Sequence, residues 1–218
     1  MNDRAVLHDI IEASAAGCPL CQRRDAAERR FVKSFAYELV NDPGMRVHLR
    51  GSLGFCRIHA EEFAAQVGAP LAVSLIHSDL CGHVVERLET NHPIRAMRPC
   101  PACEIGGQRE RHDLELLGGS AVPNLCATHP APVPKRGLPT GPSVAGALPV
   151  GSLAHAVRTD RQEVKLQGRA YSAMRRRLEA VVHHYDYRFR DDPFDDFGAT
   201  WQALALFSGT HPDRRPSP

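Results

Sequence analysis

The 218-residue sequence is poor in aromatic residues and has almost no net charge. Aromatic residues make up 6% of the chain, and 27 basic residues oppose 25 acidic ones, which leaves a net charge of +2. This balance provides no general electrostatic attraction to nucleic acid or to an anionic membrane surface. No apolar run approaches the roughly 20 residues that a membrane span needs. We therefore expect neither a nucleic-acid-binding protein nor a membrane protein.

The first eight residues lack the basic segment followed by an apolar one that marks a secretory signal peptide. We therefore expect a cytoplasmic protein. In that reducing compartment, paired cysteines bind metal or carry out redox chemistry more often than they form structural disulfides.

What the chain does contain is a repeated pattern of cysteine and histidine pairs. The order is CPxC, CxxH, CPxC, CxxH, and it uses six of the seven cysteines. Chance predicts roughly 0.2 CxxC pairs and about 0.4 CxxH pairs in such a chain. The observed pairs are Cys18-Pro-Leu-Cys21, Cys56-Arg-Ile-His59, Cys100-Pro-Ala-Cys103 and Cys126-Ala-Thr-His129.

The pattern predicts two Cys₃His metal sites, each built from consecutive pairs. Two ligands three residues apart on a tight turn can both lie about 2.3 Å from one tetrahedral Zn²⁺. We expect two zinc ions per chain, and a structural role for both, because four protein ligands leave no open coordination position. In sequence order, the ligand sets are Cys18, Cys21, Cys56 and His59 for one ion, and Cys100, Cys103, Cys126 and His129 for the other.

Other chemistries of the same residues stay open. An iron–sulfur cluster is a less usual occupant, because histidine ligation is uncommon there and no CxxCxxC run is present. A thiol–disulfide role is typical of a CPxC pair after a strand in a βαβ context, which this sequence does not show. Cys81 has no partner at ligand spacing and lies among apolar residues, so we predict a buried core residue there.

The spacing of apolar residues predicts a mainly α fold without strands of useful length. Two zinc-knuckle-like or zinc-ribbon-like Cys₃His lobes should be followed by a long C-terminal helix and a final short helix. The long helix carries a short heptad seam, which we expect to pack within its own chain. The expected helices are residues 22–40, a short one that begins at Pro43 after an Asp42 N-cap, one that begins near His59, residues 71–88, one that ends before Gly118, residues 152–189 and one around Trp201.

The pairs also predict a linear domain organisation. The spacers between the CPxC and CxxH pairs contain 34 and 22 residues, which indicates a diverged duplication. Pro130 and Pro132 make a helix directly after His129 unfavourable. The expected segments are 1–95, a first metal-binding unit with helices; 96–130, a second and shorter one; 131–151, a linker rich in Pro and Gly; and 152–218, a helical segment packing on the rest.

Several longer segments together resemble a prokaryotic protein family of unknown function. They are CPLC at 18–21, YELVNDP at 37–43, GFCRIH at 54–59 and YDYRFRDDP at 185–193 with the later Trp201. The family is marked by CPxC…FCxxH, YELVNDP and a late HDYRFRDEP…SW segment. The resemblance spans most of the chain outside 130–151. It implies the metal sites and the domain extent, and it implies no reaction.

The segment Tyr185–Trp201 is a second candidate for function, because it gathers charged, phenolic and aromatic side chains. If the segment is structural, Arg188 should pair with a partly buried carboxylate. Phe189 and Trp201 should then pack against the long helix or a metal lobe. If the segment is functional, the same side chains should line a cavity.

The sequence thus predicts an intracellular two-zinc binding or adaptor module whose partners are proteins. The motifs identify no catalytic activity. One alternative is an enzyme with a site near Tyr185–Trp201. The other is a redox-responsive or metal-responsive regulator whose thiolates release zinc on oxidation.

Overall fold

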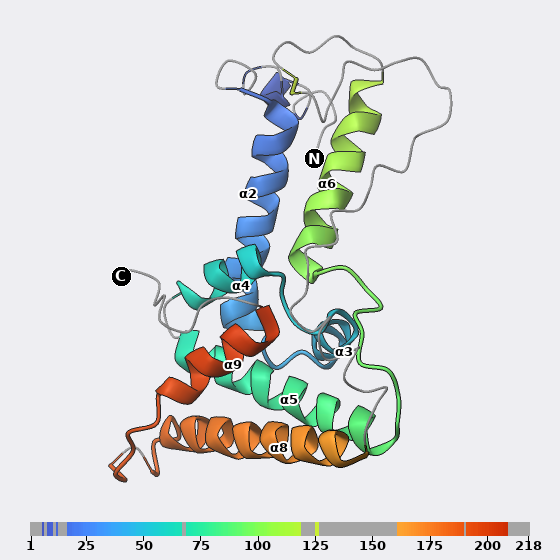
Figure 1. Cartoon of the computed structure of the whole chain (residues 1–218). Helices are drawn as coiled ribbons and strands as arrows, with labels where there is room; N and C mark the ends of the chain where they lie inside the picture. Colours follow the sequence, from blue (N-terminus) through green and yellow to red (C-terminus); the bar gives the residue numbers. More distant parts are fainter. Residues whose placement is uncertain are drawn as a thin grey trace. The chain divides into compact units, whose positions relative to one another are not determined.

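The computed structural model describes residues 6, 8–10, 12, 17–66, 69–118, 125–126, 161–189 and 191–208. This part of the chain is mainly helical and contains no strand (Figure 1). None of its helices combines the length and the apolar character that crossing a bilayer requires. His129 and the predicted linker 131–151 lie outside the described residues.

The chain divides into two compact units, and each is discontinuous in sequence. Unit 1 contains Met1–Phe31 and Ala102–Val144, and unit 2 contains Val32–Pro101 and Ala145–Pro218. Within each unit, segments distant in sequence contact one another. The linear succession of four segments that the sequence predicts stays a prediction.

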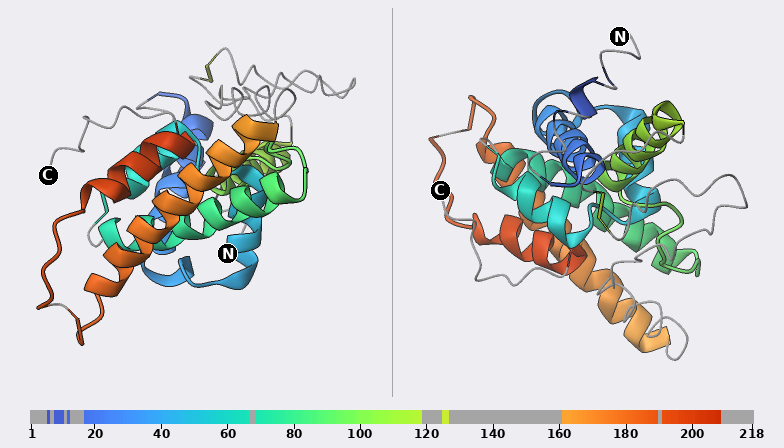
Figure 2. Two further views of the ribbon diagram at one scale, coloured as in Figure 1. Left: turned by 60° about the horizontal axis from the view of Figure 1, so that its bottom comes forward. Right: turned by 90° about the horizontal axis from the view of Figure 1, so that it is seen from above.

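Unit 2 is built on a pair of long helices. In Figure 1, α5 and α8 lie side by side and run in opposite directions, and α9 contacts both. The views in Figure 2 show the same pairing. The helices α3 and α4 also contact α5. The bounds in this unit are α3, Pro43–Ser52; α4, Arg57–Ala64; α5, Ala69–Glu89; α8, Arg161–His184; and α9, Gly198–Ser208.

Apolar side chains from these helices form the core of unit 2. Each large side chain that is buried contributes about 1.5–3 kcal/mol relative to its exposed state. Cys81 on α5 is fully buried, which confirms its prediction as a core residue. The buried members include Val73, Ile76, Leu80 and Val84 from α5, Tyr171, Leu178 and Val181 from α8, and Ala203 and Phe207 from α9.

A cluster of three aromatic rings extends this core. The ring of Phe35 meets Phe55 and Phe63 edge-on, with centroid distances of 5.0 and 5.4 Å. Phe55 and Phe63 lie 5.4 Å apart. Edge-to-face aromatic pairs contribute about 0.5–1.5 kcal/mol beyond the area that they bury. Because Phe55 directly precedes Cys56, the aromatic cluster anchors the start of α4.

The helix predicted over residues 22–40 changes its winding near the end. The α-helix α2 spans Pro19–Ser34, and the π-helix η2 continues over Phe35–Leu39. The wider π turn adds about one residue per turn and rotates the following side chains. A continuous α-helix would place Leu39, four residues after Phe35, on the buried face. Instead, Val40 is buried and Leu39 is half-buried.

The next helix, α3, has the ends that its sequence predicts. Asp42 caps it by accepting a hydrogen bond from the Met45 amide, with an N···O distance of 2.6 Å, and Pro43 is its first residue. At the other end, Leu53 adopts a left-handed conformation, and the Gly54 amide donates to the Leu49 carbonyl over 2.8 Å. This turn directs the chain toward Cys56.

Among the described residues, unit 1 has a smaller apolar core than unit 2. Leu20 of α2 and Leu117 of α6, which spans Pro101–Leu117, pack with the N-terminal residues Val6 and Ile10. Leu125 packs against this cluster.

Charged side chains join α2 to α6 in the same unit. Asp113 of α6 is fully buried and accepts hydrogen bonds from Arg23 at 2.9 Å and from Arg109 at 3.2 Å. Arg24 pairs with both Glu28 and Glu110, at 3.0 and 3.3 Å. These ion pairs connect the two helices in addition to the small apolar cluster that contains Leu20 and Leu117.

Candidate metal centres

Three of the four predicted pairs begin a helix in the same way. Cys18, Cys56 and Cys100 each stand immediately before a helix, and the second member of each pair lies in its first turn. Side chains three residues apart on a helix face the same direction. Both donors of a pair therefore point to one place, beside backbone amides and the positive end of the helix dipole, which favours thiolates.

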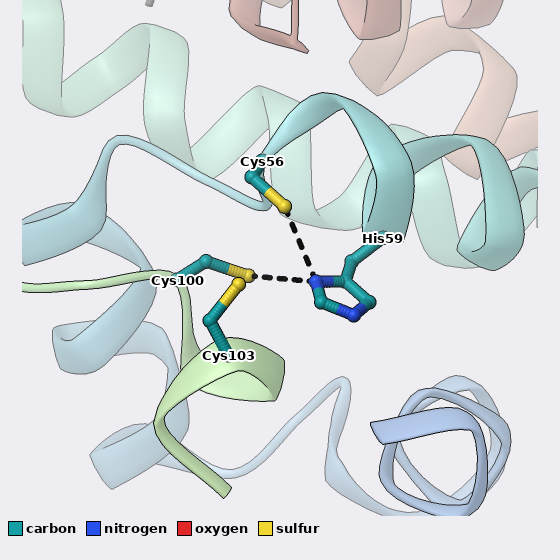
Figure 3. Close-up of side chains that lie close together, drawn as sticks. All are labelled: Cys56, His59, Cys100 and Cys103. Carbon is teal, nitrogen blue, oxygen red and sulfur yellow. Dashed lines mark hydrogen bonds between the residues drawn. The ribbon is translucent and has the colours of Figure 1, made fainter. Parts of the chain in front are cut away.

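Four of the predicted ligands converge in one group, which we call the Cys56 cluster (Cys56, His59, Cys100 and Cys103). Their donor atoms all lie within 4.8 Å of one another. Figure 3 shows the three sulfurs and the Nδ1 atom of His59 turned toward a common centre. His59 is 4% exposed and Cys100 is 9% exposed, whereas Cys56 and Cys103 are half-buried.

The distances in the Cys56 cluster fit the edges of a zinc tetrahedron. Bond lengths of about 2.3 Å for Zn–S and about 2.0–2.1 Å for Zn–N give an S···N edge of about 3.5 Å. The Nδ1 atom of His59 lies 3.2 Å from the sulfur of Cys56 and 3.6 Å from that of Cys100. All seven cysteines are free thiols, so no disulfide competes for these sulfurs.

The carbonyl of Gly51 holds Cys100 beside the start of α4. It accepts hydrogen bonds from the amides of Met97 and Arg98, with N···O distances of 2.7 and 3.1 Å. The Arg98 side chain also covers Gly51 so closely that a Cβ there would lie 3.1 Å from its Cδ atom. Gly51 lies inside α3, and its lack of a side chain lets the 97–100 segment approach.

A second group, the Cys18 cluster (Cys18, Cys21 and Cys126), lies in unit 1. The sulfurs of Cys21 and Cys126 are 3.5 Å apart, close to the S···S edge of about 3.8 Å in a zinc tetrahedron. Its three cysteines are all half-buried. The fourth predicted ligand, His129, lies outside the described residues.

The ionisation of these thiols shows why a cation suits the site. Burial raises the pKa of Cys18, but hydrogen bonds from backbone amides outweigh it, and the pKa is lowered overall. Burial and the two neighbouring sulfurs raise the pKa of Cys21 to about 12. Three thiolates in such proximity repel one another unless a positive ion lies between them.

The sequential pairing of the ligands is wrong. The prediction joined Cys18 and Cys21 to Cys56 and His59, whereas the structure joins Cys56 and His59 to Cys100 and Cys103. It joins Cys18 and Cys21 to Cys126. The reason is that the hydrogen bonds to Gly51 bring the second CPxC pair beside the first CxxH pair. The Cys56 cluster therefore combines candidate ligands from both sequence repeats.

Sequence reasoning also missed that both CPxC pairs begin helices. The prediction placed them on turns ahead of the helices, but α2 begins at Pro19 and α6 at Pro101. Proline at the first helical position was the available signal, because its fixed φ suits a helix and its missing amide needs no partner there.

The segment Tyr185–Trp201 matches its structural prediction only in part. Arg188 pairs with Asp186 at 2.6 Å, but the Arg188 side chain is 62% exposed, so the pair is not buried as expected. The ring of Phe189 stacks on His183 of α8 at 3.7 Å, as predicted for packing on the long helix. The packing of the Trp201 side chain stays a prediction.

An open cleft in unit 2 has a volume of about 380 Å³ and lies away from this segment. Arg50 is already paired with Asp79, and Arg175 with Glu179, so the two arginines are engaged within the protein. The cleft is lined by Arg50, Asp79, Gly82, His83, Val85, Glu86, Glu89 and Arg175.

A further group of His8, Asp9 and Glu12 could also surround an ion, but all three side chains are exposed. Exposed acidic groups of this kind gather on helices without any metal, so the group adds no candidate site.

Comparisons with known proteins found no counterpart. No family model matches the chain, and neither a curated protein nor a solved structure does. The resemblance to a prokaryotic family of unknown function therefore stays a prediction.

Proposed function

We propose that this protein binds two zinc ions in structural Cys₃His sites whose ligands are exchanged between the sequence repeats. The observation that carries the proposal is the convergence of four donor atoms within 4.8 Å in the Cys56 cluster. Three sulfurs and one imidazole nitrogen form a donor set typical of structural zinc. Four protein ligands leave no position for a substrate or a water molecule.

His129 is proposed as the fourth ligand of the Cys18 cluster. It follows Cys126 by three residues, the spacing that separates His59 from Cys56. In the Cys56 cluster, both donor atoms of a CxxH pair lie within 4.8 Å of the other two, which supports the same arrangement for Cys126 and His129.

With the metal in a structural role, the function lies in binding a protein partner in the cytoplasm. Large apolar side chains on the surface support this part of the proposal, because a partner can cover them. Ile58, located between two ligands, is 69% exposed, and Tyr187 is 81% exposed. In-cell cross-linking should yield one dominant adduct for the parent protein, and Ile58→Ser or Tyr187→Ser should weaken it.

Elemental analysis of the purified protein tests the metal content. We expect two zinc ions and no iron per chain.

Two double variants then test the exchange of ligands. In Cys56→Ser/Cys103→Ser, both changes fall in one proposed site, so one zinc ion should remain. In Cys21→Ser/Cys56→Ser, the changes fall in different proposed sites, so no zinc ion should remain. Sequential pairing predicts the reverse.

Cys81→Ser is the matched control and should retain two zinc ions. The parent protein supplies a second test that needs no variant to fold. After loading with one equivalent of zinc, alkylation should find Cys56, Cys100 and Cys103 protected together or exposed together. Joint protection of Cys56 with Cys18 and Cys21 would overturn the exchanged pairing.

A further inference from the structure

The two proposed zinc sites differ in how well the protein shields their donors. In the Cys56 cluster, His59 and Cys100 are buried and Cys56 and Cys103 are half-buried, and the Gly51 carbonyl holds the segment that carries Cys100. In the Cys18 cluster, all three cysteines are half-buried and none is buried. Oxidants attack thiolates that they can reach, so we expect the cluster without a buried donor to react first.

The geometry of the Cys18 cluster places the sulfurs of Cys21 and Cys126 within reach of a disulfide. The sulfurs of Cys21 and Cys126 lie 3.5 Å apart, and they need to approach by about 1.5 Å to reach bonding distance. Leu125 packs against the apolar cluster that contains Leu20. This contact keeps Cys126 close to the first turn of α2 without help from the metal.

We propose that the Cys18 cluster is a peroxide-responsive zinc site that exchanges its ion for a Cys21–Cys126 disulfide. This proposal rests on the zinc site proposed above. The two thiolates give two electrons to one hydrogen peroxide molecule. The O–O bond breaks, the S–S bond forms, and the two oxygens leave as water after taking up two protons. Zn²⁺ leaves because two of its anionic ligands are gone.

The proposed Cys21–Cys126 disulfide cross-links two distant segments, whereas a Cys18–Cys21 disulfide within the CPxC pair does not. Cys21 and Cys126 are 105 residues apart in sequence, so their bond closes a long loop, as the metal does. A Cys18–Cys21 bond closes only one turn of chain and connects no distant segments. Oxidation therefore removes the ion from unit 1 while it preserves the cross-link.

The experiment uses the two-zinc parent protein and a graded dose of hydrogen peroxide. Released zinc is followed with a colorimetric chelator, and the disulfide is mapped by mass spectrometry of peptides. We expect one zinc per chain to be released at least tenfold faster than the second, together with a Cys21–Cys126 disulfide. Reduction in the presence of zinc should restore two ions per chain.

Three results would overturn the proposal: release of both ions at one rate, no release at all, or a Cys18–Cys21 disulfide as the first product. Cys81→Ser is the control and should release zinc like the parent. Zinc content before oxidation separates the two proposals. Fewer than two ions at the start contradicts the proposed function, whereas two ions without selective release contradict only the peroxide response.

Discussion

The α2–α6 pair of unit 1 and the α5–α8 pair of unit 2 both join helices that are distant in sequence, but they use different chemistry. Ion pairs around the buried Asp113 link α2 to α6, beside a small apolar cluster. Apolar side chains such as Leu80 and Leu178 fill the core between α5, α8 and α9.

This contrast indicates where the proposed metal matters most. Burial of apolar side chains stabilises a helix pair at about 1.5–3 kcal/mol for each large side chain. A buried ion pair contributes little net stability, because desolvation of its charges offsets their attraction. Unit 1 therefore needs a further source of stability, and the Cys18 cluster lies where it can supply one. Unit 2 has an apolar core of its own.

Removal of the metal should have the largest effect and should separate the two regions. Structural zinc supplies about 10–16 kcal/mol of apparent binding free energy in small zinc domains. After treatment with a strong chelator, amides in α2 and α6 should lose protection from hydrogen exchange, while those in α5 and α8 should keep most of theirs. Equal loss in both helix pairs would show that the comparison is wrong.

In unit 2, Phe63→Ala should lower the free energy of unfolding by about 3–5 kcal/mol. Phe63 is fully buried and packs against Phe35 and Phe55. The loss should appear in chemical denaturation with zinc content unchanged. Tyr37→Ala, at a side chain that is 60% exposed, is the control and should have little effect.

In unit 1, Asp113→Asn should destabilise the α2–α6 pair by about 3–5 kcal/mol, because it leaves partly buried arginines without a counter-charge. Hydrogen exchange of α6 amides measures this local change. Glu179→Gln removes the partner of Arg175 in an exposed pair and should change stability by less than about 1 kcal/mol. A null result at Asp113 would mean that the ion pairs do not join these helices.

Acid should destabilise unit 2 through His77. Burial lowers the pKa of His77 from 6.5 to about 4 in the folded protein. Between pH 6.5 and pH 4 the unfolded chain binds a proton that the folded protein does not. The contribution of neutral His77 to the free energy of unfolding is therefore fully present above pH 6.5 and is lost as the pH falls toward 4. The total loss is about 3 kcal/mol. The His77→Phe variant should lack this acid-dependent loss of stability. Denaturation curves of the variant and the parent, recorded at equal zinc content, measure the difference.

The smallest effect is expected at Arg188→Ala. The pair with Asp186 is solvent-exposed, and solvent screens exposed ion pairs. The melting temperature should match that of the parent within error. A clear decrease would indicate that the segment Tyr185–Trp201 contributes to the core after all.

Local features of the fold could be predicted because neighbouring residues decide them. Asp42 and Pro43 determine where α3 begins, and the apolar neighbours of Cys81 indicate its burial. The burial of Val40 in place of Leu39 could not be predicted, because a π turn leaves no clear signal in the spacing of apolar residues. Helix starts at Pro19 and Pro101 were available in the sequence and were missed.

The sequence by itself identified the candidate donor residues and the pairs in which they occur, because residues three apart at a helix start share one direction. Only the tertiary structure decided which pairs meet. The hydrogen bonds from Met97 and Arg98 to Gly51 bring Cys100 to Cys56, and no spacing rule encodes a contact between segments so distant in sequence. The choice of candidate ligands is a local property of this chain, whereas the grouping of these residues follows from its long-range packing.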